Sequence, residues 1–127
     1  MYSALKLAAD DKEDGNLEVQ DIFQLELKPA YLVTLSACDT HVGSIKAGDE
    51  IVVMSLAFMY AGTPSVLASL WKVDDYYTEK LMVSFYRSLE NTDKITALQL
   101  ARKEMIEKHG KRHPFYWAPF VLIGDFR

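Results

Sequence analysis

The spacing of hydrophobic and polar positions changes several times along the chain, and each change predicts a different element. Residues 3–9 alternate between apolar and polar, a charged turn follows, and the alternation resumes at Leu17–Val19. This order predicts a peripheral antiparallel hairpin, Ser3–Val19, with an acidic tip. Asp21 then has a side chain suited to a helix N-cap, and Pro29 predicts the end of a short helix.

Three short apolar segments predict strands. Tyr31–Leu35 lies between a proline and a polar, glycine-containing loop, and Ser65–Trp71 follows a glycine and a proline. Apolar runs with turn-forming boundaries are typical of strands that are buried on both faces of a parallel sheet. A last run, Phe120–Gly124, is short enough to be a third parallel strand.

The segments between these strands have helical patterns. Ile51–Ala61 is almost wholly apolar and follows acidic residues that suit a helix N-terminus, so we expect a helix that is packed on most of its sides. Asp74 or Asp75 can cap a further helix with one apolar face, and a second such helix follows Asp93. The residues of these two faces are Tyr77, Leu81, Phe85 and Leu89, and then Leu98, Ala101 and Met105.

The alternation of strands and helices predicts an α/β fold, with a mostly parallel sheet flanked by helices. About three strands are few for this class, in which sheets usually hold about 5–6 strands. We therefore expect a sheet that is incomplete at its N-terminal side. The length of 127 residues, half of them hydrophobic, predicts a single domain.

Charge and composition argue against several classes of function. A formal net charge of −4 gives no basic surface for nucleic acid, so we expect no DNA or RNA partner. No apolar run approaches the roughly 20 residues that span a bilayer, and the first residues lack a signal-peptide pattern, so neither a membrane span nor export is expected. A single cysteine excludes an internal disulfide and suits a reducing, cytoplasmic location.

Cys38 is the strongest candidate for a catalytic residue. It follows the Tyr31–Leu35 strand directly, and active sites of open α/β sheets gather beyond the carboxyl ends of the strands. A thiol close to the start of the next helix can be stabilised as the nucleophilic thiolate. Because an unpaired cysteine is also a common inert core residue, both interpretations stay open at this point.

A cysteine nucleophile needs a base, which is usually histidine. His41 lies in the same loop, although a solvent-facing loop residue is the simpler interpretation. His109 and His113 follow a basic helix end, where a cation suits the helix dipole. Cys38 and His41 lack the paired spacing of a zinc motif, and no phosphate-binding loop is present, so we expect neither a metal nor a cofactor.

The segment after the second predicted strand is a further candidate. Trp71, Asp74 and Asp75 leave that strand toward the same edge of the sheet as Cys38. A carboxylate there can pair with a cationic side chain of a substrate. The alternative for either aspartate is an ordinary helix cap.

Several ordered segments carry a resemblance to a known family. They are Leu32–Thr40, Gly48–Glu50 with Ala57–Phe58 and Ala61–Gly62, Ser65–Asp75, and His113–Asp125. Together they resemble the C-terminal part of a CHAT domain, the caspase-like domain associated with tetratricopeptide repeats. The resemblance implies a caspase-like sandwich over residues 1–127, in which residues 1–29 form a peripheral hairpin and short helix and residues 30–127 form the core.

The resemblance also implies a function. It suggests a cysteine endopeptidase with Cys38 as the nucleophile, and a pocket at Trp71, Asp74 and Asp75 for the substrate residue before the scissile bond. The histidine of the family belongs to a His-Gly motif that would precede Met1, so we expect residues 1–127 to be inactive alone unless His41 is the base. The family usually has glycine where His41 stands.

The same resemblance implies the partners. They are a peptide or protein substrate, the upstream half of the domain and tetratricopeptide repeats. An incomplete sheet also predicts self-association, through an open strand edge or by exchange of the Ser3–Val19 hairpin. The alternative function is a non-catalytic, caspase-like module for protein interaction.

Overall fold

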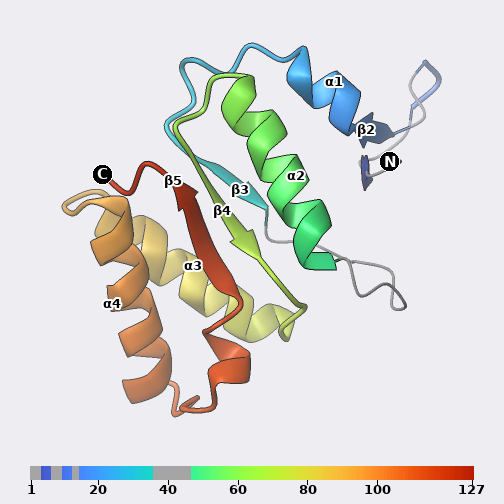
Figure 1. The fold of residues 1–127 in the computed structure, drawn as a ribbon. Helices are drawn as coiled ribbons and strands as arrows, with labels where there is room; N and C mark the ends of the chain where they lie inside the picture. Colours follow the sequence, from blue (N-terminus) through green and yellow to red (C-terminus); the bar gives the residue numbers. More distant parts are fainter. Residues whose placement is uncertain (1–3, 7–9, 13–14, 36–46) are drawn as a thin grey trace.

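The computed structural model describes residues 4–6, 10–12, 15–35 and 47–127, which form a small sheet between helices (Figure 1). The N-terminal part is an antiparallel hairpin of β1 (Ala4–Lys6) and β2 (Asn16–Glu18), as predicted. It leads directly into α1 (Val19–Phe23).

The start of α1 differs from the prediction. Glu18, not Asp21, is the N-cap, and the Asp21 carboxylate accepts a hydrogen bond from the Glu18 N–H at 3.0 Å. An acidic residue three positions after the cap stabilises a helix start in this way, so a residue suited to capping also suits the first turn. The helix also ends at Phe23, well before Pro29.

The central sheet has the order β3 (Val33–Leu35), β4 (Ser65–Ser69), β5 (Phe120–Gly124). β3 and β4 are parallel, as predicted, with Leu35 opposite Ala68. β5 is antiparallel to β4, so the prediction of a third parallel strand was wrong. The reason is that two helices separate β4 from β5, and the second returns the chain to the edge at which β4 ends.

Helices cover the two faces of the sheet unequally. α2 (Ala47–Tyr60) lies on one face, and α3 (Asp75–Leu89) and α4 (Lys94–Glu107) lie on the other (Figure 1). β4 is buried along its whole length: Val66 and Ala68 pack toward α2, whereas Leu67 packs toward α3 and α4. A single turn of 3₁₀ helix, η1 (Pro114–Tyr116), precedes β5.

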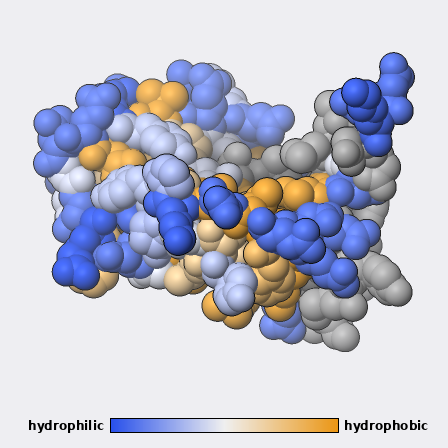
Figure 2. Space-filling model, turned by 90° about the horizontal axis from the view of Figure 1, so that it is seen from above, coloured by the Kyte–Doolittle hydropathy of each residue, from blue (hydrophilic) through white to orange (hydrophobic). Residues whose placement is uncertain are grey.

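The two helices on the α3–α4 side have the predicted apolar faces, and α2 is buried on most of its sides, as predicted, except along one stripe. Val52, Leu56 and Tyr60 recur every four residues on its outer side, where Leu56 is 55% and Tyr60 76% exposed. Figure 2 shows the hydrophobic surface that results over α2 and α1. The rest of the helix is packed against the sheet and α1, so the expectation of a helix packed on most of its sides is confirmed, and only this stripe was not foreseen.

None of the helices in the described ranges combines the length and the hydrophobicity that crossing a bilayer requires.

Candidate functional site

The carboxyl ends of β3 and β4 meet at the lower edge of the sheet in Figure 1. Their parallel register places Leu35 beside Ala68, so the segments that follow the two strands start next to each other, about 5 Å apart. Cys38 and His41 belong to the segment after β3. Both lie outside the described residues, so the surroundings of the thiol and of the imidazole remain a prediction.

Trp71 lies two residues beyond β4, in a turn that hydrogen bonds hold in place. The Ser69 hydroxyl donates to the Trp71 carbonyl at 2.6 Å, and the Leu70 N–H donates to the Pro119 carbonyl at 2.9 Å. The indole Nε1 of Trp71 donates to the Phe115 carbonyl at 2.9 Å. The ring of Trp71 is consequently fixed at this edge, with part of its surface exposed.

The two aspartates after Trp71 have different environments. Asp74 is the N-cap of α3, and its carboxylate accepts a hydrogen bond from the Tyr76 N–H at 2.9 Å. Asp75 is the first residue of α3 and is exposed, and the structure records no hydrogen bond or ion pair of its side chain with any described residue. Asp74 therefore takes the capping role that was predicted for one of the two.

A lysine lies beside this cap. The Lys111 ammonium is 4.5 Å from the ring centroid of Tyr77 and 4.9 Å from that of Tyr116. A hydrogen bond with Tyr77 is the main cause that raises the pKa of Lys111, and the charge of Asp74 contributes less. The hydrogen bond to the Tyr76 N–H occupies Asp74, which leaves Asp75 as the more available carboxylate.

Phe115 was not recognised as a site residue from the sequence. Its ring stacks on Trp71, with the centroids 6.3 Å apart and the planes 26° from parallel. Behind it, edge-to-face contacts continue through Tyr116 and Tyr77 to Tyr76. Trp71 and Phe115 are 44 positions apart, so no local pattern could have paired them; only the shared strand edge brings them together.

Of the two described histidines, His113 has a structural role. His113 precedes η1, and its Nδ1 accepts a hydrogen bond from the Phe115 N–H at 3.1 Å. An imidazole that accepts at Nδ1 carries its proton on Nε2, so it has no unoccupied acceptor for a substrate proton. The backbone N–H of His109 bonds to the Glu104 carbonyl at the end of α4.

The described residues contain no cluster of three or more histidine, cysteine, aspartate or glutamate side chains that could hold a metal ion.

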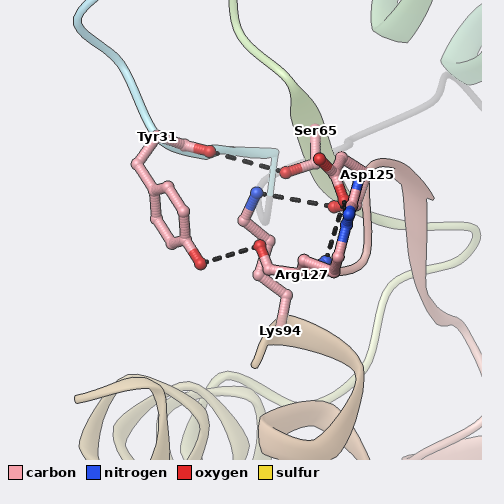
Figure 3. Close-up of polar contacts among 5 residues, drawn as sticks. All are labelled: Tyr31, Ser65, Lys94, Asp125 and Arg127. Carbon is pink, nitrogen blue, oxygen red and sulfur yellow. Dashed lines mark hydrogen bonds and ion pairs between the residues drawn. The ribbon is translucent and has the colours of Figure 1, made fainter. Parts of the chain in front are cut away.

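The opposite edge of the sheet contains a second polar cluster, which the sequence did not reveal (Figure 3). Lys94 is the first residue of α4 and is only 1% exposed. Its Nζ lies 3.9 Å from the ring centroid of Tyr31 and donates to the Asp125 carbonyl at 3.4 Å. Burial lowers the pKa of Lys94, and the charge of Asp125 partly opposes this.

The residues around Lys94 connect the start of β3 to the end of β5. The Tyr31 hydroxyl donates to the Arg127 carbonyl at 2.9 Å, and the Ser65 hydroxyl donates to the Tyr31 carbonyl at 3.5 Å. Asp125 accepts from Arg127, which lowers the pKa of its carboxyl through the backbone and then the side-chain hydrogen bond. We call Tyr31, Lys94, Asp125 and Arg127 the anchor cluster.

Comparison with known proteins agrees with the resemblance found in the sequence. The CHAT domain family model matches residues 1–125. Tetratricopeptide repeat protein 28 from Homo sapiens is 35% identical over 129 residues, which cover 91% of this chain and 5% of that protein. The protein of the same name from Mus musculus is 36% identical over 110 residues, which cover 86% of this chain and 4% of that protein. The chain thus spans only a small fraction of these relatives, and it belongs to the CHAT domain family.

Proposed function

We propose that this chain is the nucleophile-bearing part of a caspase-like cysteine peptidase domain, with Cys38 as the nucleophile. The observation that supports this most is the parallel pairing of β3 with β4. Their register starts the Cys38 segment beside the Trp71–Asp75 segment, at the edge where α/β proteins bind ligands. The proposal takes one bound peptide to contact both Cys38 and the Trp71–Asp75 segment.

In the proposed reaction the Cys38 thiolate attacks the carbonyl carbon of the scissile peptide bond. Backbone N–H groups near Cys38 stabilise the oxyanion. A histidine then protonates the leaving amine, and water hydrolyses the thioester to release the acid and regenerate the thiol. We propose that this histidine lies on polypeptide outside residues 1–127, because His113 already uses its Nδ1 as an acceptor. His41 remains the alternative base.

The substrate side chain before the scissile bond is proposed to be basic. An exposed carboxylate at the start of α3 can form a charge-assisted pair with arginine or lysine. Asp75 fits this role better than Asp74, since Asp74 caps the helix whereas Asp75 is exposed. Trp71 forms the adjoining wall.

The upstream half of the domain and tetratricopeptide repeats are the proposed partners within the intact protein. Among the described strands β3 pairs with β4 alone, so its other edge can accept a further strand. The names of the two relatives, both tetratricopeptide repeat proteins, support the association with repeats. A single cysteine further supports a reducing, cytoplasmic location for the intact protein.

The test uses the full-length protein and a fluorogenic peptide with arginine before the cleaved bond. Cys38→Ala should abolish hydrolysis, and Asp75→Asn should lower kcat/KM for the arginine peptide more than Asp74→Asn does. Thiol labelling of Cys38 should have a pH midpoint below the ordinary value of about 8.5. Hydrolysis that persists in Cys38→Ala would contradict the proposal.

The second candidate is a non-catalytic interaction module, and the exposed outer side of α2 favours it. An apolar stripe of Val52, Leu56 and Tyr60 is costly to leave in water and is typical of surfaces that other proteins or further copies cover. This candidate predicts an ordinary labelling midpoint for Cys38 and no hydrolysis by the full-length protein. Leu56→Ser should then weaken self-association in sedimentation, with little change in unfolding temperature.

A further inference from the structure

The outer side of α2 and the end of α1 form one exposed apolar surface (Figure 2). Val52, Leu56 and Tyr60 follow one another at intervals of four residues, so they lie on one side of α2 over about 12 Å of its length. Phe23, the last residue of α1, continues this line, because its ring contacts that of Tyr60 edge to face with the centroids 5.2 Å apart. All four side chains are at least 42% exposed. We call these four residues the outer stripe.

Acidic side chains lie at both ends of the outer stripe. Asp49 is exposed and precedes Val52 by three residues, so it lies on the same side of α2 near the start of the helix. Near the other end, Glu26 is exposed in the segment that follows α1. This segment runs beside the end of α2, since the Leu27 N–H donates to the Ala61 carbonyl at 2.7 Å. The outer stripe is therefore an apolar surface between acidic groups.

The charge of this face distinguishes between its possible occupants. Residues 15–35 and 47–61 contain five acidic residues and one lysine. In a symmetric pair of two copies the same face meets itself, so acidic ends would lie against acidic ends, and like charges at an interface are costly. A helix with apolar residues along one side and basic residues at both ends matches the face in charge. It also matches in shape, because residues four apart form the ridges that pack into the grooves of a neighbouring helix.

We propose that the outer stripe binds a helix of a tetratricopeptide repeat from the same intact protein, with lysine or arginine at each end of the apolar side of that helix. This inference rests on the proposed association with repeats, which the names of the two relatives support. Such repeats consist of pairs of helices, so an amphipathic helix is the element that they present to a neighbour. The contact between Phe23 and Tyr60 holds two rings of the stripe in place before binding, which reduces the entropy lost when the helix binds.

The experiment uses the full-length protein with a photo-crosslinking benzophenone amino acid in place of Leu56, and mass spectrometry identifies the peptide that becomes attached. We expect this peptide to belong to a repeat helix with lysine or arginine at both ends of its apolar side. The matched control carries the same amino acid in place of Val83, a 48% exposed apolar residue of α3 on the other face of the sheet. From that position we expect no cross-link to the same helix.

The acidic ends are tested with the same cross-link. Asp49→Asn combined with Glu26→Gln should lower the yield roughly 3-fold or more, as expected for the loss of two exposed ion pairs. Glu79→Gln, at an exposed acidic residue of α3, is the matched control and should leave the yield unchanged. The unfolding temperature of each variant shows whether the fold is retained. An unchanged yield in a folded double variant overturns a helix with basic ends as the occupant.

Other products of the cross-link at position 56 overturn the docking. A cross-linked dimer would assign the outer stripe to a second copy, a product with the upstream half of the domain would assign it to the fold of the domain, and the absence of a product would show that the stripe stays uncovered. Peptide hydrolysis by the full-length protein separates this inference from the peptidase proposal. If the cross-link joins a repeat helix but no peptide is cleaved, the docking stands and the peptidase proposal fails. If cleavage occurs and the cross-link joins another partner, the docking alone fails.

Discussion

The same strands run between the two ends of the three-stranded sheet, but the side chains at the two ends have different roles. Each end is called an edge and is named by the strand termini that lie there. At the edge where β3 begins and β5 ends, the anchor cluster bonds to itself and to the backbone (Figure 3). At the carboxyl edge, backbone and indole hydrogen bonds hold Trp71 and Phe115, whose rings remain partly exposed, and Asp75 is exposed beside them. At the first edge the polar side chains bond to one another and to the backbone. At the carboxyl edge the hydrogen bonds fix aromatic side chains that remain partly exposed.

The difference shows how a short strand is held in position. β3 has three residues and one partner among the described strands, so its own ladder provides few hydrogen bonds. The anchor cluster provides further hydrogen bonds at the start of β3. Three successive carbonyls after β5 accept hydrogen bonds there: that of Asp125 from Lys94, that of Phe126 from the Ile95 N–H, and that of Arg127 from Tyr31. We infer that the hydrogen bonds at this edge keep β3 fixed.

The largest effect is expected from Lys94→Ala. The substitution removes a buried four-carbon stem and the cation under Tyr31, and leaves a cavity at the start of α4. Truncation of a buried long side chain costs about 2–4 kcal/mol of unfolding free energy. Urea unfolding measures the loss, and Lys103→Ala, at an exposed lysine of the same helix, should change stability by less than about 0.5 kcal/mol. Equal effects of the two substitutions would show that the anchor cluster contributes no stability.

A smaller effect is expected at the carboxyl edge from Asp74→Ala. It removes the hydrogen bond to the Tyr76 N–H at the start of α3, and loss of an N-cap costs about 1 kcal/mol. Asp75→Ala is the matched control, because its carboxylate makes no such bond with the described residues; it should stay within about 0.5 kcal/mol of the wild type. Thermal unfolding of both variants checks this. A larger loss from Asp75→Ala would reverse the roles of the two aspartates.

The charge of Lys94 can be separated from its stem by Lys94→Met. Burial lowers the folded-state pKa, so the charged form destabilises the fold at neutral pH, and this cost falls as the pH rises toward the ordinary value of 10.5. Replacement of a buried cation by an apolar side chain of similar size is often neutral or stabilising. We expect Lys94→Met within about 1 kcal/mol of the wild type or above it at pH 7, with the advantage of the variant shrinking as the pH rises toward 10.5. A variant that is less stable at pH 7 by more than this would show that the cation is needed.

Hydrophobic patterning was sufficient to predict most of the fold. The pattern of apolar residues predicted the positions of the strands, the apolar faces of α3 and α4 and the parallel pairing of β3 with β4. The structure confirms that residues of this pattern, such as Val66, Leu81 and Leu98, are buried. The direction of β5 did not follow, because a short apolar run contains no information on strand orientation. The exposed side of α2 could not be predicted from the sequence either, because the same apolar residues are compatible with a fully buried helix and with a helix that has one exposed apolar side.

The site could be predicted only in part. Trp71, Asp74 and Asp75 could be named as candidates because they follow a strand, but the contacts of Phe115 and Lys94 depend on residues more than 30 positions away in the sequence. A lysine at the start of a helix is also unfavourable for the helix dipole, so no local rule would place one in the anchor cluster. The roles of Cys38 and His41 remain predictions from the sequence.

The smallest effect is expected within the anchor cluster from Tyr31→Phe. This change removes the hydrogen bond to the Arg127 carbonyl but keeps the ring over Lys94. Because the hydroxyl is exposed and water replaces its partner, we expect a loss of only about 0.5 kcal/mol. Tyr31→Leu removes the ring as well, and the cation–ring contact with Lys94 should raise the loss to about 1–2 kcal/mol. Urea unfolding of both variants, repeated in the Lys94→Met background, completes a double-mutant cycle. If the loss from Tyr31→Leu is the same in both backgrounds, the ring does not stabilise the lysine, and the anchor cluster is held by its carbonyl hydrogen bonds alone.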